Sequence, residues 1–329
     1  MVVNAEGEVL FLKRSSRDRA LVLTLAVCFL LLFGGQQGLA EEPPMARDDI
    51  QAVEPFPLDE LRPGMKGIGK TVVTGTKIEE FQVEILGVLA GQETVKKLIL
   101  VQVSGNVIDR MGGIAAGMSG SPVYVNDKLV GAISYTFNLT DHRLGMVTPI
   151  EPMLEILQLA NETVAWEPPY GVWRWADVGE QVRMVGDYST EEICITMGSS
   201  PEGQVSYVSG CLNISPAATP LLVGGMGERA RQRLAASLKP LGMETIAVSG
   251  SSAVALSGDG QAQPVIEPGS AFGVQLVGGD VGVMSLGTVT YRNGNEFLGF
   301  GHPFMNRGSV NLFVTSAYIY TTVNSLSMP

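Results

Sequence analysis

A serine framed by small residues is the first feature of this chain that could do chemistry. Ser119 stands between a methionine and Gly120, within the stretch GMSGSP at residues 117–122. Glycine near the serine lets the backbone approach a substrate carbonyl without a Cβ in the way. Successive N–H groups of such a turn can point into one concavity and hold an oxyanion. The pattern indicates a nucleophile on a tight turn, and the alternative is a Gly/Ser-rich turn without chemistry.

Two histidines are available as the general base that a serine nucleophile needs at neutral pH. His302 follows a predicted strand, within the glycine-framed stretch GFGH, and Pro303 stiffens the next bond. A histidine placed at a strand end can face a cleft between two structural units, and the alternative is a purely structural side chain. His142 lies in a polar loop, where we expect it to be solvated. His302 is therefore the candidate base.

The elements around the serine turn are predicted to be short strands. Apolar and polar residues alternate over residues 81–85, which is the period of a half-buried strand. Asn126 and Asp127 between two apolar runs predict the turn of a β-hairpin. Six strands and a helix are the content of a small β-barrel, which we place at residues 61–160. The predicted strands are residues 70–74, 81–89, 98–103, 122–125, 129–135 and 146–150, and the helix is 151–159.

A second strand-rich stretch, residues 266–329, carries the candidate base. A connecting region, residues 161–265, precedes it and contains one amphipathic helix at 226–241, with Gly242 as its C-terminal stop. Two similar strand-rich units favour a mainly β fold built from a pair of barrels. The chain stops shortly after the last apolar run, so it either ends naturally or lacks a closing strand. The predicted strands are residues 272–277, 281–286, 288–291 and 297–300, followed by an apolar run at 310–320.

The first 40 residues have the layout of a secretory signal peptide. Basic residues between positions 13 and 19 precede an apolar stretch at 20–33, and Gly38-Leu39-Ala40 supplies small residues at the cleavage site. An uncleaved anchor is the alternative, although this stretch of about 14 residues is short for a span of about 20. Residues 41–60 are acidic, contain prolines and predict a flexible leader. We therefore expect an exported protein, periplasmic or extracellular, without a stable membrane span after cleavage.

Composition limits the partners and cofactors. The net charge of −11 and the pI near 4.8, without a basic stripe, argue against nucleic acid as a partner. Two cysteines remain after signal cleavage, Cys194 and Cys211, which either form one disulfide or stay as core thiols. Two cysteines and two histidines do not make a zinc site of the Cys/His type. We expect no metal and no cofactor.

Two blocks of the sequence resemble the SpoIVB-type serine peptidases, a sporulation-factor family. The first block, GGIAAGMSGSP at 112–122, continues through NDKLVGA at 126–132 to IEPML at 150–154 and looks like the family's nucleophile segment. The second block, which contains GTVTY at 287–291 and GFGH at 299–302, is similar to its histidine segment.

The resemblance implies an exported serine endopeptidase that acts on protein or peptide substrates. Carried over to this chain, Ser119 would be the nucleophile and His302 the general base. The N–H groups of Gly117 and Ser119 would form the oxyanion hole. The implied fold is a pair of trypsin-like β-barrel units, with a short inserted helical segment.

The order of the blocks departs from the family pattern, in which the histidine block precedes the serine block. Catalysis depends on geometry and not on chain order, so permuted halves can still meet. The family's acid, upstream of the serine block, has no clean match here. Asp109 is the nearest carboxylate and our candidate third member, with Asp280 as a second candidate and a Ser–His dyad as the alternative. The rival function is a catalytically inactive envelope binding or regulatory protein on the same scaffold.

Overall fold

The computed structural model of this chain is mainly β, as the sequence predicts. The predicted signal peptide and most of the predicted leader lie outside the described residues. Within the described part, no helix is long and apolar enough to cross a membrane. The structure describes residues 54–90, 97–137, 141–159, 172–177, 184–185, 188–189, 194–197, 211–217, 219–238, 243–248, 265–304 and 310–322.

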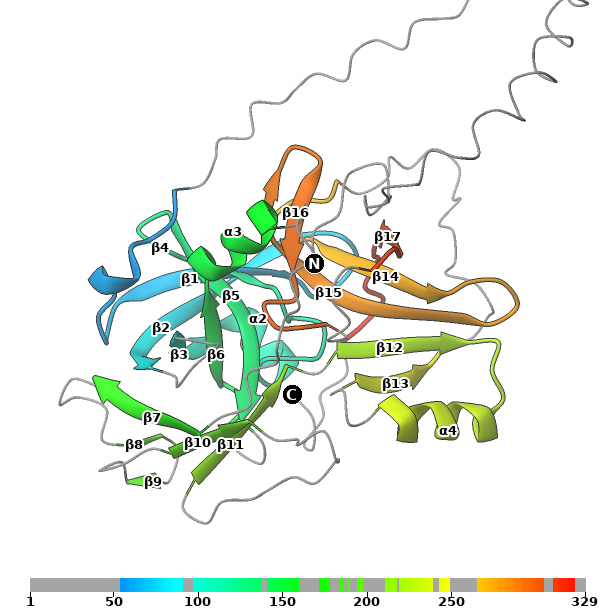
Figure 1. Cartoon of the computed structure of the whole chain (residues 1–329), viewed down its shortest axis with the longest axis horizontal. Helices are drawn as coiled ribbons and strands as arrows, with labels where there is room; N and C mark the ends of the chain where they lie inside the picture. Colours follow the sequence, from blue (N-terminus) through cyan, green and yellow to red (C-terminus); the bar gives the residue numbers. More distant parts are fainter. Residues whose placement is uncertain are drawn as a thin grey trace, which may run out of the picture. The chain divides into compact units, whose positions relative to one another are not determined.

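Six antiparallel strands close into the barrel that the sequence predicts around the serine (Figure 1). Going round the barrel, β1 pairs with β2, β2 with β3, β3 with β6, β6 with β5, β5 with β4, and β4 with β1 again. Closure leaves no free edge in this ring of strands. The strands are β1 (Lys66–Val72), β2 (Ile78–Ala90), β3 (Lys97–Ser104), β4 (Pro122–Val125), β5 (Lys128–Phe137) and β6 (Leu144–Pro149).

The hairpin that follows the serine turn is confirmed. Between β4 and β5, Asn126 and Asp127 have φ angles of 50° and 60°. Positive φ at both central residues is the type I′ geometry, whose twist matches that of the flanking strands. The hairpin therefore fixes the direction in which the chain leaves Ser119.

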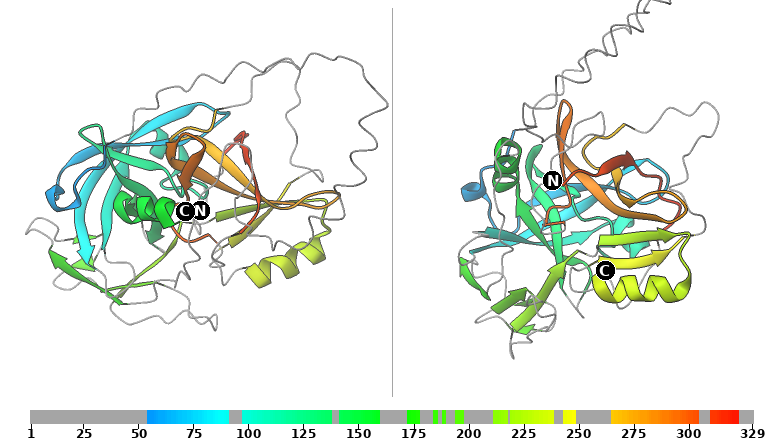
Figure 2. Two further views of the ribbon diagram at one scale, coloured as in Figure 1. Left: turned by 45° about the horizontal axis from the view of Figure 1, so that its top comes forward. Right: turned by 45° about the vertical axis from the view of Figure 1, so that its right-hand side comes forward.

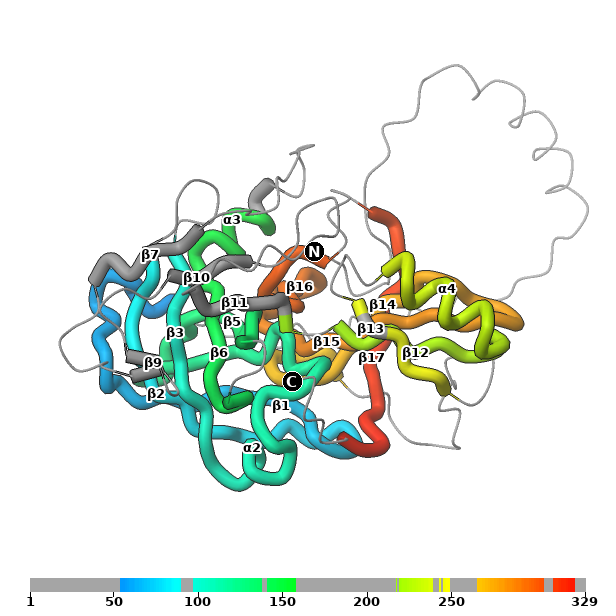
Figure 3. Tube along the Cα trace, turned by 90° about the horizontal axis from the view of Figure 1, so that it is seen from below, coloured from blue at the N-terminus to red at the C-terminus, as the bar shows by residue number. Residues whose placement is uncertain are grey.

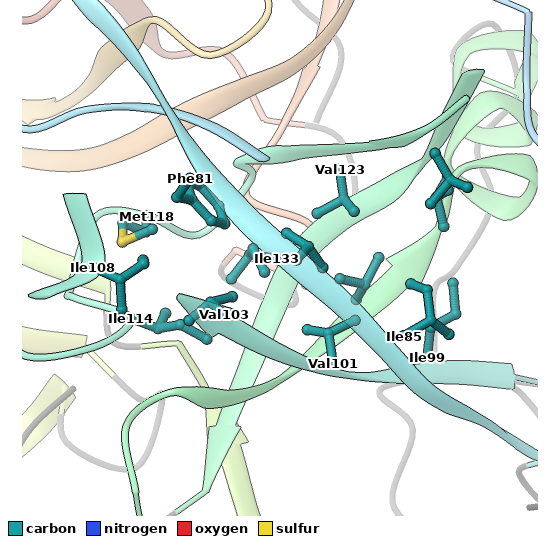
Figure 4. Packing of buried hydrophobic residues seen from close by; sticks show 14 of the residues in the cluster. Phe81, Ile85, Ile99, Val101, Val103, Ile108, Ile114, Met118, Val123 and Ile133 are labelled. Carbon is teal, nitrogen blue, oxygen red and sulfur yellow. The ribbon is translucent and has the colours of Figure 1, made fainter. Parts of the chain in front are cut away.

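The barrel interior is filled by apolar side chains, and one of them comes from the serine turn. Met118 is buried beside Phe81 and Ile108 (Figure 4). Met118 therefore anchors the serine turn in the core of the barrel, and Ser119 is not needed to fill that core. Phe56, in the predicted flexible leader, is also buried in this cluster, and its N–H donates to the Leu129 carbonyl at 2.9 Å. The buried Phe56 ring and this hydrogen bond hold the end of the predicted leader, from Glu54 onward, against the barrel.

Two helices flank the barrel. α3 (Ile150–Leu159) is confirmed at its predicted place and packs on β5 and β16 (Glu296–Gly299). α2 (Asn106–Met111) was not predicted, because six residues are too few to show helical periodicity. It lies between β3 and the serine turn and carries Asp109.

The second unit is a sheet whose central strand is β15, with β12 on one side and β14 on the other (Figure 2). Its strand order is β13-β12-β15-β14-β17, and β16 also pairs with β15. Among the described residues β13 pairs only with β12 and β17 only with β14, so the described strands form an open sheet beside the one closed barrel. The strands are β12 (Thr219–Gly224), β13 (Met243–Ala247), β14 (Ala271–Val277), β15 (Gly282–Asn293) and β17 (Phe313–Ser316).

The predicted amphipathic helix belongs to the second sheet. α4 (Glu228–Leu238) connects β12 to β13 and lies against β13 (Figure 3). β12 and β13 are parallel, and parallel neighbours need a crossover connection, usually a helix. This part of the predicted connecting region is therefore a βαβ element of the second sheet.

Other strands from the predicted connecting region extend the barrel. β7 (Val172–Asp177) pairs with β2, β11 (Cys211–Pro216) pairs with β5, and β10 (Cys194–Met197) lies between β7 and β11. A separate ribbon consists of β8 (Met184–Val185) and β9 (Tyr188–Ser189). Residues 161–265 thus contribute strands to both sheets.

The strand register places the two remaining cysteines side by side. Cys194 of β10 is directly opposite Cys211 of the parallel strand β11. Neighbouring strands lie about 4.8 Å apart, within the Cα separation of roughly 4.4–6.8 Å that a disulfide spans. We expect a Cys194–Cys211 disulfide in the oxidised protein, detected by mass spectrometry as one cross-linked peptide pair in an unreduced digest. Alkylation of both thiols without prior reduction would contradict this.

Candidate active site

The serine turn is built from tight local hydrogen bonds. The Met118 N–H donates to the Ala115 carbonyl at 3.0 Å, and the Ser121 N–H donates to the Met118 carbonyl at 2.9 Å. The Gly120 N–H donates to the carbonyl of Ile133, on β5, at 2.8 Å. These bonds attach the turn to the barrel on one side.

The second sheet holds the turn from the other side, through β15. The Thr288 N–H donates to the Ser119 carbonyl at 2.9 Å, and the Thr288 hydroxyl donates to the Gly117 carbonyl at 2.8 Å. The Thr290 hydroxyl donates to the Gly120 carbonyl at 2.7 Å. The loop that carries the candidate nucleophile therefore joins the two sheets.

Two N–H groups of the turn remain without an acceptor among the described residues, and they belong to Gly117 and Ser119. These are the two groups that the resemblance assigns to the oxyanion hole. A vacant N–H pair on a glycine-framed turn is the arrangement that stabilises a developing oxyanion. Their assignment stays a prediction, and this geometry supports it.

The Ser119 side chain is fully buried and donates its hydroxyl hydrogen to the carbonyl of Phe300. The same carbonyl accepts the His302 backbone N–H at 2.7 Å. Both groups bond one oxygen atom, so the serine hydroxyl lies within two hydrogen-bond lengths of the His302 backbone. The structure thus brings together the two residues from blocks far apart in the sequence.

The His302 ring makes its hydrogen bonds elsewhere. Its Nδ1 donates to the Pro303 carbonyl at 2.9 Å, so Nε2 is the basic nitrogen of the neutral ring. Nε2 lies 3.4 Å from the hydroxyl of Thr219, a buried residue at the start of β12. No hydrogen bond joins the ring to Ser119 in the part of the chain that the structure describes. Thr219 was not singled out from the sequence, where nothing marks it.

Burial determines the protonation state of His302. Desolvation lowers the pKa of this imidazole to about 4, and bonds to the backbone of Pro303 and Ala217 oppose that shift without cancelling it. The rings of Tyr135 and Phe300 lie near it, each with a centroid separation of 6.2 Å. At neutral pH the ring is therefore uncharged and able to accept a proton.

The backbone from Phe300, whose carbonyl accepts the Ser119 hydroxyl, to His302 has an unusual conformation. Phe300 and Gly301 have φ angles of 68° and 61°, and the Phe300–His302 bond closes a γ-turn around Gly301. Positive φ is a rare conformation for a bulky residue such as phenylalanine. Packing holds it in place, since the Phe300 ring stacks on Phe304 at 4.8 Å and lies edge-on to Phe272 at 4.9 Å.

Asp109 is not placed against His302. Its carboxylate lies on the exposed side of α2 and forms an ion pair with Arg143 at 2.8 Å. The His302 ring is oriented by the Pro303 carbonyl, and no candidate carboxylate is hydrogen-bonded to it among the described residues. We expect Asp109→Asn to change the rate of any Ser119-dependent reaction less than about threefold, because exposed ion pairs contribute little. Progress curves at pH 7 check this, and a hundredfold loss would restore Asp109 as the acid.

Neither Asp280, the second candidate acid, nor His142 is hydrogen-bonded to the Ser119 hydroxyl in the described part of the chain. Asp280 is exposed in the connection between β14 and β15. His142 is half-buried rather than solvated, with its Nδ1 buried and unpartnered, and its carbonyl accepts the Ile114 N–H at 2.8 Å. His142 packs against the backbone of Gly113, in the segment that leads to the serine turn. A Cβ on residue 113 would lie 2.4 Å from the His142 Cβ, so this close contact requires glycine.

The barrel and its serine turn correspond to a known family. Residues 52–154 match the SpoIVB peptidase S55 family. The resemblance expected from the sequence is thus confirmed for a stretch that includes Ser119, while His302 lies outside the matched residues. Searches of curated proteins and of solved structures found no match. The serine-bearing barrel is therefore similar to a SpoIVB peptidase domain.

Proposed function

We propose that this protein is an exported serine endopeptidase of the SpoIVB type. Ser119 attacks the scissile carbonyl carbon, His302 Nε2 takes the hydroxyl proton, and the Gly117 and Ser119 N–H groups hold the oxyanion. His302 then returns the proton to the leaving amine, and water hydrolyses the acyl-enzyme in the same way. The observation that carries this proposal is the Phe300 carbonyl, which hydrogen-bonds to both the Ser119 hydroxyl and the His302 backbone.

Catalysis requires a rearrangement of the Phe300–His302 turn. In the structure the Ser119 hydroxyl is bonded to the Phe300 carbonyl, and His302 Nε2 faces Thr219. Rotation of the peptide after Phe300 would release the serine hydroxyl and redirect the imidazole. Rotation of this peptide changes ψ of Phe300 and φ of Gly301, and glycine accepts either sign of φ.

The alternative is a catalytically inactive envelope binding or regulatory protein. Complete burial of Ser119 favours this reading, because a substrate must reach the hydroxyl to be attacked. The two functions differ in whether the native protein ever exposes a reactive serine.

Labelling with an organofluorophosphonate separates these functions, since the reagent forms a phosphonate ester with an activated serine and releases fluoride. We expect the native protein to be labelled on Ser119 and Ser119→Ala not to be labelled. Ser121→Ala is the matched control, because Ser121 is an equally buried serine two residues away whose hydroxyl has no partner. Absence of labelling in the native protein, or equal labelling of Ser119→Ala, would favour the inactive alternative.

A further inference from the structure

β15 presents two buried hydroxyl groups to the serine turn. Thr288 is 2% exposed and Thr290 is fully buried. They are two positions apart on the strand, so their side chains lie on the same face, and both hydroxyls bond the turn. A buried strand position takes valine as readily as threonine unless the hydroxyl has a partner. Here each hydroxyl has one, a backbone carbonyl of the turn. The side chains are therefore suited to hold main-chain groups rather than to fill space.

The bonds from β15 determine which way the peptides of the turn point. C=O and N–H of one peptide unit point in opposite directions, because the peptide is planar and trans. Because Thr288 holds the Gly117 carbonyl, the Met118 N–H of the same peptide points toward the Ala115 carbonyl. With the Ser119 carbonyl held by the Thr288 N–H, the Gly120 N–H turns toward Ile133 on the barrel.

Within residues 117–121, the N–H groups of Gly117 and Ser119 remain without an acceptor among the residues that the structure describes. Every carbonyl from residue 117 to residue 120 has a donor, either on β15 or within the turn. The Ser119 N–H shares a peptide with the Met118 carbonyl, so a flip of that peptide would break the hydrogen bond from the Ser121 N–H. The peptides on either side of it are held by β15 through the Gly117 and Ser119 carbonyls. Thr288 therefore restrains the peptides that flank the Ser119 N–H, and Thr290 holds the Gly120–Ser121 peptide, whose N–H bonds the Met118 carbonyl.

We infer that Thr288 and Thr290 are positioning residues that set the oxyanion hole of Ser119 from the second sheet. This inference rests on the proposed function and adds to it. The hole is complete only when β15 is docked on the barrel domain, so the domain matched by the family would not suffice for catalysis. Neither threonine touches substrate, and both act through the backbone of the turn.

The test uses the full chain, with fluorophosphonate labelling split into the inhibitor affinity KI and the maximal rate of phosphonylation. We expect Thr288→Val/Thr290→Val to lower the maximal rate by about 100-fold, the loss seen when an oxyanion donor is removed. KI should change less than about threefold, because the loss appears only in the transition state. Thr288→Ser/Thr290→Ser should restore the rate to within about threefold, since it keeps both hydroxyls. The pH profile should keep its shape, because His302 is untouched.

The matched control is Thr136→Val, which removes a buried hydroxyl that has no hydrogen-bond partner. It should leave the maximal rate unchanged. If the double valine variant labels at the native rate while Ser119→Ala is not labelled, the inference is overturned and the proposed function stands. If Ser119→Ala is labelled like the native protein, the proposed function itself fails. A rate loss that matches only a fall in folded protein, measured by thermal unfolding of the same samples, would also overturn the inference.

Discussion

Replacing His302 by glutamine is expected to slow fluorophosphonate labelling of Ser119 by about 10³-fold, because general-base catalysis contributes roughly 10²–10⁴. Glutamine retains hydrogen-bonding capacity near Thr219 and Pro303 but cannot take the serine proton. His142→Gln is the control, since it removes the chain's other imidazole. A His302→Gln variant labelled within threefold of the native rate would exclude this histidine as the base.

The pH dependence of the same reaction follows from the pKa of His302, which burial lowers to about 4. The ring accepts a proton only when neutral, so the labelling rate should stay level from pH 8 to about pH 5 and fall through pH 4. A solvated histidine would give a fall near pH 6.5. A profile with its midpoint near 6.5 would show that the imidazole leaves its buried position before it acts.

Folding stability should change over the same range. The folded pKa lies below the unfolded value, so the contribution of neutral His302 is present above pH 6.5 and is lost as the pH falls to 4. The difference corresponds to at most about 3 kcal/mol. Urea unfolding at pH 7 and at pH 4 measures it, and His302→Gln should lose less stability between these two conditions than the native protein.

Gly120→Ala is expected to have the second large effect, a loss of about 3 kcal/mol in unfolding free energy together with loss of labelling. Gly120 has a φ of 97°, which costs a residue with a Cβ about 1–2 kcal/mol. A Cβ there would also lie 2.0 Å from the Thr288 carbonyl oxygen and 2.6 Å from the Phe300 nitrogen. Both contacts are with backbone, so the alanine must push β15 and the histidine block away from the serine turn, at a further cost of about 1–3 kcal/mol.

Gly64→Ala is the matched control for this substitution. Gly64 has a similar φ of 84°, but a Cβ there would meet nothing within 4 Å. It should therefore lose only the conformational part, about 1–2 kcal/mol. Equal losses in the two variants, measured by urea unfolding at pH 7, would show that the contact between the serine turn and β15 is not close in solution.

Together these variants test one idea, that the active site exists only where the two sheets meet. The SpoIVB match covers the barrel and the serine, but the candidate base and the hydroxyls that hold the turn come from the second sheet. The order of the serine and histidine blocks along the chain does not prevent their contact in the fold, because a catalytic dyad depends on geometry and not on chain order.

Local pattern was enough to predict the six barrel strands and the helices α3 and α4. The alternation in β2, the Asn126-Asp127 turn, the helical spacing of α3 and the amphipathic face of α4 each appear within about 15 residues of sequence. Short-range sterics and burial determine such features, so they can be read from the residues themselves. The glycine-framed Ser119 and His302 were also recognisable, because their residue types limit the chemistry available.

Only the tertiary structure decided how these elements meet. Nothing local shows that β15 hydroxyls bond the serine turn, that the Ser119 hydroxyl is held by the Phe300 carbonyl, or that Asp109 pairs with Arg143. These contacts join residues 34 to 181 positions apart, and they depend on the packing of two sheets. The sequence alone determined a candidate nucleophile and a candidate base. The fold decided that they share one carbonyl, since long-range pairing is set by the burial of whole surfaces and not by any single stretch of chain.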